Sequence, residues 1–368
     1  MNPVARSTAP LTTAVGVPPR LRQLVRELLV FLEHPARQSR DEYEVIETHL
    51  VGLQCLTRSL DAEFVGMTEQ LRSVQQWFRD ETDPVFRLSK FYERIRTWPA
   101  GHPGDYVTLE QVYRNEPCSA GVGYHLDRYG LSRPLAVGVR SRMRTLARLL
   151  QRRAAVEAPA GHWLNLGCGS CRELLFLADD SAARTIHCVD TDRDALAFAD
   201  RLLAGKRIGA LDFVAENALR FCRAERNVQR FGTFSTIYSA GLFDYLSSDA
   251  LSRLIGALWE SLREGGLLIA PFKDAERYDT FDYHWLSKWH FFFQREAGQY
   301  REILASAGIP ETAVRVQRDD SGLILFFLIR KSAQDEEPGE IEAGAADWES
   351  GGKTWRVDAP GDRKHIHS

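Results

Sequence analysis

The chain has 368 residues, of which 44% are hydrophobic and 26% charged, and its formal net charge at pH 7 is −3. Such values are typical of a globular protein, and the small net charge gives no reason to expect nucleic acid or an anionic membrane as a partner. Because no apolar run is long enough to cross a bilayer and the first 20 residues lack the apolar core of a secretory signal, we expect a cytoplasmic protein without stable membrane insertion.

The first part of the chain is predicted to be helical. Residues 1–19 are rich in Pro, Ala, Thr and Ser and are expected to form a flexible tail. From residue 20 to 98 apolar side chains recur every three or four positions, which predicts an all-helical lobe that could carry a homodimer contact. Asp83-Pro84 has the residue types of a helix start, so we expect a new helix there.

Residues 99–157 are expected to form a lid loop followed by linking helices. The loop from Trp98 to Tyr106 is dense in Pro and Gly, yet it also presents Trp, His, Asp and Tyr, a set that a plain connector would not need. A helix is predicted from about 135 to 156. Its arginine cluster, Arg140 to Arg144, is interpreted as a solvated helix face.

From residue 158 to 331 apolar runs of strand length alternate with helical segments, which predicts an α/β domain with a parallel sheet. The expected strands are 162–166, 185–189, 210–214, 233–239, 266–271, 312–318 and 322–330. The expected helices are 172–178, 193–204, 216–224, 248–263 and 295–307. Asp319 to Gly322 has hairpin chemistry, so the last two strands should be antiparallel. Residues 332–368 lose apolar periodicity and are expected to be disordered.

The first strand of this domain ends in a glycine turn, Gly167-Cys168-Gly169, of the kind that lets backbone N–H groups face a ligand. Asp190 ends the next apolar run, 23 residues after Gly167, at the spacing of a carboxylate that binds a ribose. Arg172 stands where the third glycine of a dinucleotide fingerprint belongs, which disfavours a nicotinamide cofactor. Cys168 and Cys171 lie inside the turn without a second pair, so we expect neither a metal site nor a redox pair.

Five motifs follow one another between residues 160 and 330: the turn from Asn165 to Cys171, Asp190, Glu216-Asn217-Ala218, the segment from Tyr238 to Tyr245, and the Gly265-Gly266 turn from Leu262 to Leu268. In this order they resemble the motifs of the class I S-adenosylmethionine-dependent methyltransferases. The resemblance implies a Rossmann-like sheet closed by an antiparallel hairpin, S-adenosylmethionine as cofactor, and methyl transfer. Asn165 stands in place of the first-motif acid, and Cys171 in place of its third glycine.

The same resemblance implies a set of cofactor-binding residues. They are Asn165, Gly167, Gly169, Arg172, Asp190, Asn217, Ser239 and Asp244. Asp190 is expected to hold the ribose hydroxyls, while Asp192 is expected to cap the following helix. Asn217 either borders the adenine or caps a helix, and Arg172 either pairs with the cofactor carboxylate or lies on a solvated helix face.

A narrower resemblance rests on the loop 98–106, Arg172-Glu173, the segment 241–246 and Trp289-His290-Phe291. These segments are similar to bacterial methyltransferases related to the enzyme that makes 3-hydroxy fatty acid methyl ester signals. That likeness implies a small-molecule acceptor with a carboxylate or hydroxyl, either fatty-acid-like or a secondary metabolite.

Transfer of a sulfonium methyl group requires chiefly that donor and acceptor are aligned and that water is excluded. The residues expected on the acceptor side are Asp105, Tyr106, Tyr245, Trp289 and His290, with Asp244 beside them. A hydroxyl acceptor would need a base such as His290, whereas a carboxylate would not. The aromatic rings could stabilise a sulfonium by cation–π attraction, although simple packing would produce the same spacings.

Three alternative functions remain open from the residues alone. A related enzyme could cyclise or transfer the aminobutyrate part of S-adenosylmethionine and release methylthioadenosine. The altered first motif and the unassigned helical lobe would also suit a non-catalytic S-adenosylmethionine-binding module. An NAD-linked oxidoreductase is the third alternative, and it fits the glycine turn least well.

Overall fold

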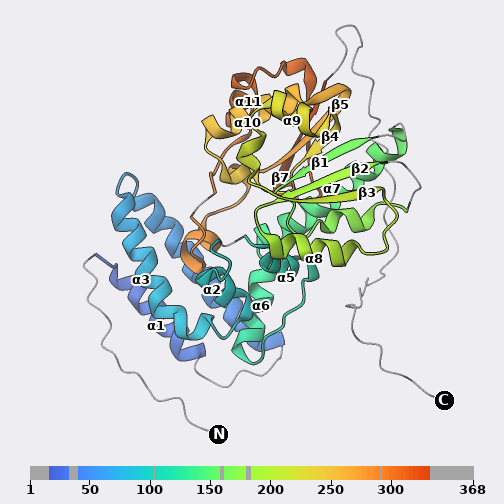
Figure 1. Cartoon of the computed structure of the whole chain (residues 1–368). Helices are drawn as coiled ribbons and strands as arrows, with labels where there is room; N and C mark the ends of the chain where they lie inside the picture. The colour runs from blue at the N-terminus through green and yellow to red at the C-terminus, as the bar shows by residue number, and fades with distance from the viewer. Residues whose placement is uncertain are drawn as a thin grey trace, which may run out of the picture. The chain divides into compact units, whose positions relative to one another are not determined.

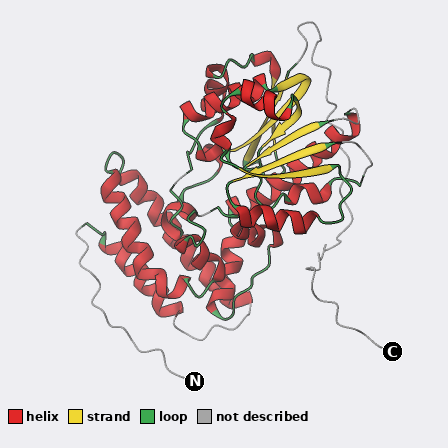
Figure 2. Ribbon diagram, in the orientation of Figure 1, coloured by secondary structure: helices red, strands yellow, loops and turns green. Residues whose placement is uncertain are grey.

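The computed structural model describes residues 16–32, 40–102, 104–157, 161–179, 184–290 and 292–331. Within this part of the chain, helices alone precede the first strand, and strands then alternate with helical segments (Figure 2). The tails expected at both ends lie outside the described residues, except for 16–19, where the first helix begins at Pro19. No helix in the described ranges has both the length and the apolarity to span a membrane.

In the described residues that precede the sheet, the chain forms seven α-helices. Figure 1 shows their arrangement. They are α1 (Pro19–Leu32), α2 (Arg40–Glu63), α3 (Thr68–Phe86), α4 (Lys90–Thr97), α5 (Tyr106–Arg114), α6 (Val122–Ser132) and α7 (Pro134–Val156). Their apolar stripes form one buried cluster, which includes Leu28, Leu50, Phe78 and Leu126. The cluster also takes in Trp285 from far along the chain, and the ring of Trp285 meets that of Phe78 edge-on at 5.9 Å.

The helix start expected at Asp83-Pro84 is wrong. Pro84 lies within α3, which runs on to Phe86, and the next helix begins only at Lys90. Ser89 is the better cap, because its hydroxyl accepts a hydrogen bond from the Tyr92 N–H at 3.0 Å. Phe86 is fully buried against the Tyr92 ring, so core packing holds the last turn of α3 in place despite the proline.

The sheet has seven strands in the order β3-β2-β1-β4-β5-β7-β6. Their bounds are β1 (His162–Leu166), β2 (Thr185–Asp190), β3 (Ala210–Ala215), β4 (Phe234–Tyr238), β5 (Leu262–Lys273), β6 (Val314–Arg318) and β7 (Ile324–Arg330). The strands β1 to β5 are parallel, and β7 pairs antiparallel with both β5 and β6. This arrangement confirms the expected Rossmann-like sheet with a closing hairpin.

Helices cover both faces of this sheet. The helical segments are η1 (Arg172–Phe176), α8 (Arg193–Leu203), η2 (Ala218–Phe221), α9 (Ala224–Phe231), η3 (Phe243–Tyr245), α10 (Ser248–Glu260), η4 (Ala275–Arg277), the π-helical η5 (Phe281–Leu286), α11 (Ala297–Ser306) and η6 (Glu311–Ala313). One apolar cluster joins the sheet to α10 and α11 through Leu254 and Tyr300, and another joins it to α7 and α8 through Leu146 and Leu196 (Figure 1).

Two of the expected helices are different in the structure. The segment predicted as a helix over 172–178 is a short 3-10 turn, and the one over 216–224 is a 3-10 turn followed by a separate helix, α9. In the second case Asn217 starts the turn by accepting a hydrogen bond from the Leu219 N–H at 2.8 Å. Each turn follows a strand whose carboxyl end lies at a cavity, and residues of both turns line that cavity.

Candidate cofactor and acceptor site

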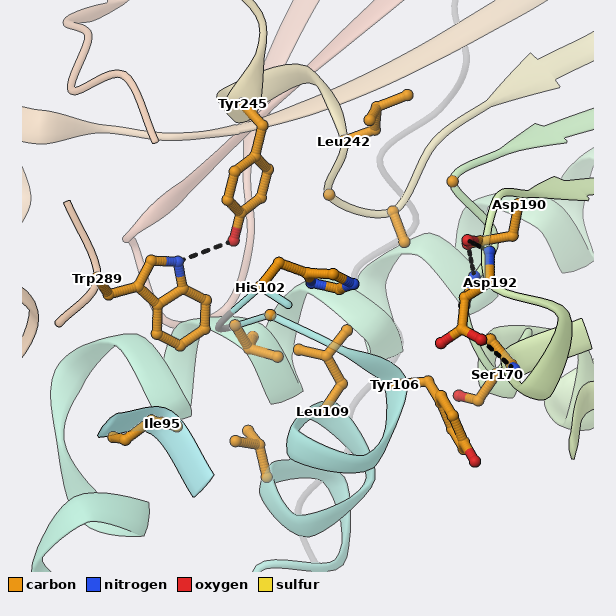
Figure 3. A pocket seen from close by; sticks show the side chains of 18 of the residues that line it. Ile95, His102, Tyr106, Leu109, Ser170, Asp190, Asp192, Leu242, Tyr245 and Trp289 are labelled. Atoms are coloured by element: carbon orange, nitrogen blue, oxygen red, sulfur yellow. Dashed lines mark hydrogen bonds between the residues drawn. The ribbon is translucent and has the colours of Figure 1, made fainter. Parts of the chain in front are cut away.

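The carboxyl ends of β1, β2 and β4 open into a cavity of about 590 Å³. The order of the sheet reverses between β1 and β4, and such a switch point is where open α/β sheets bind ligands. Loops of the sheet form one wall, and helices α4 to α7 with the segment 282–289 form the other (Figure 3). The volume is in the range of small-molecule sites.

The glycine turn has a backbone that other residues would resist. Gly167 and Gly169 have φ angles of +61° and +52°, and a Cβ at Gly167 would approach the Leu242 Cβ at 3.1 Å. Cys171 adopts the left-handed region as well, with φ +51°, at the position where the resemblance expects a third glycine. The altered motif therefore keeps the glycine-like turn at a strain on the order of 1 kcal/mol.

Asp190 lies at the cavity with both carboxylate oxygens on backbone donors (Figure 3). It accepts hydrogen bonds from Gly169 N–H at 2.8 Å and from Asp192 N–H at 2.9 Å. Each oxygen keeps a lone pair that can accept a further bond from a ligand hydroxyl. The expectation that Asp192 caps the next helix is confirmed, because it accepts from the N–H groups of Asp194 and Ala195.

Of the other residues expected to bind the cofactor, some line the cavity and others are buried behind it, where they hold the surrounding loops in place. Asn217 lines the cavity and also caps η2, so both of its proposed roles remain compatible with its position. Asn165 is buried behind the turn and donates to Glu173 at 2.9 Å. Ser239 is buried and accepts a bond from Leu242 N–H at 3.1 Å, which holds the loop after β4.

Arg172 and Asp244 each form an ion pair with another side chain of the protein. The Nε of Arg172 donates to the Glu110 carboxylate at 2.8 Å, and its Nη2 bonds the same group, so neither of its expected alternatives describes it. Asp244 is fully buried, pairs with Lys273 Nζ at 2.6 Å and accepts a bond from the Tyr300 hydroxyl at 3.0 Å. Neither residue is among those that line the cavity.

On the acceptor side, Tyr106, Tyr245 and Trp289 all line the cavity. The indole Nε1 of Trp289 donates to the Tyr245 hydroxyl at 3.0 Å, so two segments 44 residues apart form one polar edge (Figure 3). Gly104 on the lid loop makes room for them, because a Cβ there would lie 2.8 Å from the Tyr245 hydroxyl and 3.1 Å from the Trp289 ring.

Asp105 and His290 do not line the cavity. Asp105 is buried, caps α5 by accepting from Thr108 N–H at 2.9 Å, and pairs with Arg94 at 2.8 Å, so it fixes the lid loop. His290 stacks on His284 with ring centroids 4.7 Å apart. Burial lowers the pKa of His290 to about 3, so the ring is neutral above that pH.

The structure adds cavity residues that sequence reasoning did not select. His102, from the lid loop, projects into the cavity between Trp289 and Asp190 (Figure 3). The sequence signal for His102 was its position in the aromatic-rich loop from Trp98 to Tyr106. Glu173 accepts bonds from Asn165 and the Tyr238 hydroxyl, and burial raises its pKa to about 7. Arg142 lines the cavity and is 4% exposed, so the expected solvated arginine face is wrong at this position.

The comparisons with known proteins agree with this arrangement. A family model described as a methyltransferase domain matches residues 164–268, from β1 into β5. Among solved structures, a possible exported protein from Bordetella parapertussis is 20% identical, with 85% of this chain and 96% of that chain covered and a TM-score of 0.51. The comparison with curated proteins found no match.

Two further solved structures are more distant. One is 1,6-didemethyltoxoflavin-N1-methyltransferase from Burkholderia thailandensis with S-adenosylhomocysteine, 17% identical, covering 52% of this chain and 79% of its own at a TM-score of 0.35. The other is magnesium protoporphyrin IX methyltransferase from Synechocystis, 13% identical, covering 54% and 84% at a TM-score of 0.37.

The chain therefore has the class I S-adenosylmethionine-dependent methyltransferase fold, with its methyltransferase domain match over residues 164–268. The expected cofactor, S-adenosylmethionine, is the one that such a domain uses. The left-handed glycines and the Asp190 carboxylate at the end of β2 fit it, since the turn admits close approach of a ligand and the carboxylate can accept ribose hydroxyls.

Proposed function

We propose that this protein transfers a methyl group from S-adenosylmethionine to a small-molecule acceptor in the same cavity. The observation that carries the proposal is the continuity of that cavity. Gly167, Gly169 and Asp190 line one part, while Ile95, Leu109 and other apolar side chains of the helices line the other. A donor and an acceptor bound side by side in such a space would be aligned and shielded from water.

Different residues of the cavity would bind the cofactor and orient the acceptor. The backbone at Gly167 and Gly169 would admit the cofactor, Asp190 would accept its ribose hydroxyls, and Asn217 would border its adenine. S-adenosylmethionine would supply the activated methyl group on its sulfonium. Tyr245 and Trp289 would then orient the acceptor and exclude water at the opposite wall.

The apolar wall favours an acceptor with an aliphatic part. Ile95, Leu109, Val112 and Val139 supply hydrocarbon surface, which suits the fatty-acid-like substrates implied by the narrower resemblance. A carboxylate acceptor can attack the methyl group without a base. For a hydroxyl acceptor the base would be His102, which is in the cavity, rather than His290, which is outside it.

The test is an assay of the purified chain with S-adenosylmethionine and a series of saturated and 3-hydroxylated fatty acids. We expect S-adenosylhomocysteine and a methylated acid in equal amounts by mass spectrometry. Release of methylthioadenosine instead would overturn methyl transfer and support the aminobutyrate alternative. Cofactor binding without turnover of any acid or of a metabolite extract would favour a non-catalytic module.

We propose a cytoplasmic protein that forms a homodimer through its helical lobe, to be checked by fractionation and analytical ultracentrifugation. We also propose the division into a helical lobe (20–98), a lid with linking helices (99–157) and a cofactor domain (158–331). Limited proteolysis that cuts first between these ranges would support that division.

A further inference from the structure

Arg142, near the middle of α7, is a buried cation without a counter-charge. Its side chain lines the cavity, its residue exposure is 4%, and its Nη1 is buried without a hydrogen-bond partner. Among the described residues, no carboxylate lies within 4.0 Å of the guanidinium, and none accepts a hydrogen bond from it. The guanidinium carries a full positive charge, which only an anionic group can compensate.

The fold makes room for this guanidinium. It lies against the loop after β4, where a Cβ on Gly241 would be 2.8 Å from Nη2 and 3.1 Å from Cζ. Any side chain at position 241 would therefore displace it. A buried charge costs several kcal/mol unless it is paired, so a site kept open for an unpaired guanidinium points to an anionic ligand.

Of the described residues that line the cavity, the lysine and the other arginine already have partners. Lys273 pairs with Asp244 at 2.6 Å, and Arg133 pairs with Asp282 at 3.2 Å. Arg172, which the sequence pattern had suggested as a carboxylate ligand, is held by Glu110. Arg142 therefore offers a single uncompensated positive charge to a ligand, which matches a carboxylate better than a doubly charged phosphate.

We propose that Arg142 is the carboxylate-binding residue of this cavity. Its planar fork can donate two parallel hydrogen bonds to one carboxylate group. The proposal rests on the proposed function, under which two ligands carry that group: the amino-acid end of the cofactor and an acidic acceptor. The chemistry recognised is the same in both cases, and the experiment below separates the two sources.

The experiment uses two pairs of probes that differ in one carboxylate. The first pair is S-adenosylhomocysteine and methylthioadenosine, which lacks the amino-acid group. The second pair is decanoate and 1-decanol, measured with S-adenosylhomocysteine present. Calorimetry compares the full-length protein with Arg142→Met, Arg142→Lys and Gly241→Ala, with Arg144→Met on the exposed face of the same helix as control.

We expect Arg142→Met to weaken one acidic probe at least tenfold while its neutral partner stays within twofold. Arg142→Lys should recover part of the loss, Gly241→Ala should reproduce part of it, and Arg144→Met should have no effect. A loss for S-adenosylhomocysteine alone identifies the cofactor as the source, and a loss for decanoate alone identifies the acceptor. Both results support the proposal.

Unchanged affinity of Arg142→Met for both acids would overturn the proposal, and so would equal losses for an acid and its neutral partner. Thermal melts of every variant show whether it is folded under the conditions of the titrations. A variant that unfolds would lose affinity for both the acidic and the neutral probe of a pair. A wild-type protein that fails to bind S-adenosylhomocysteine would count against the proposed function itself, which is a separate outcome.

Discussion

The two walls of the cavity are built in different ways. The proposed cofactor wall consists of a glycine turn and strand ends from Gly167 to Asn217, with the loop after β4 beside them. The proposed acceptor wall contains Ile95, Gly104 and Trp289, which are up to 194 positions apart in the sequence. The first wall presents backbone groups and carboxylates, among them Asp190 and Glu173, whereas the second presents mainly apolar and aromatic side chains. A cofactor common to many proteins can be held by short local motifs, but an individual acceptor needs a surface assembled by packing.

The largest effect of a single substitution is expected at the proposed cofactor wall. Asp190→Ala would remove the proposed acceptor of two ribose hydroxyls and leave the N–H groups of Gly169 and Asp192 without their partner. We expect S-adenosylhomocysteine affinity to fall roughly 1,000-fold, about 4 kcal/mol, by calorimetry. The exposed Asp194→Asn is the control and should bind normally. Normal binding by Asp190→Ala would remove Asp190 from the site.

A second variant tests whether Arg172 belongs to the cofactor wall or only supports it. Arg172→Met would leave Glu110 buried without its cation, so we expect a loss of about 3 kcal/mol in the free energy of unfolding. Cofactor affinity should remain within twofold under conditions where the protein is folded. The double variant Glu110→Met with Arg172→Met should recover most of the stability. A tenfold loss of affinity in that double variant would return Arg172 to the cofactor site.

The stability of the protein should depend on pH through Glu173, a buried residue of η1 that lines the cavity. Burial raises its pKa to about 7 in the folded protein from a value near 4.5 when unfolded. Between those two values the folded state binds more protons, so this group's contribution to stability is full below pH 4.5 and is lost as the pH rises to 7. From pH 5 to 7 the loss should be about 2 kcal/mol.

Glu173→Gln is the matched control for that effect. Urea unfolding of both proteins across the same pH range isolates the carboxyl group, because the buried histidines contribute equally to each. We expect the stability of the wild type relative to the variant to fall with rising pH. A difference that stays constant between pH 5 and 7 would contradict a raised pKa.

The smallest effect is predicted at the acceptor wall. Gly104→Ala would place a methyl group 2.8 Å from the Tyr245 hydroxyl and so shift the Tyr245–Trp289 edge. We expect the KM of an accepted fatty acid to rise about tenfold, roughly 1.4 kcal/mol, with the KM of S-adenosylmethionine unchanged. Gly52→Ala on α2, where a Cβ meets nothing within 4 Å, is the control. An equal rise in both KM values would break the distinction between the walls.

The sequence by itself determined the sheet, its closing hairpin and the cofactor. Strand runs and the spacing from Gly167 to Asp190 are local patterns, and local patterns follow from backbone geometry and hydrophobic periodicity. For the same reason Asp192 could be assigned as a cap, since a cap bonds N–H groups only two and three residues away.

Only the tertiary structure decided which charged and polar side chains reach the cavity. Arg172 and Arg142 are both arginines in helical segments, yet α5 brings Glu110 to the first, while no carboxylate of the described ranges pairs with the second. Asp105 turns inward to cap α5, while His102, three residues earlier, faces the site. Each outcome depends on partners distant in sequence, because a long-range contact sets the energy of a buried charge and local spacing carries no record of it.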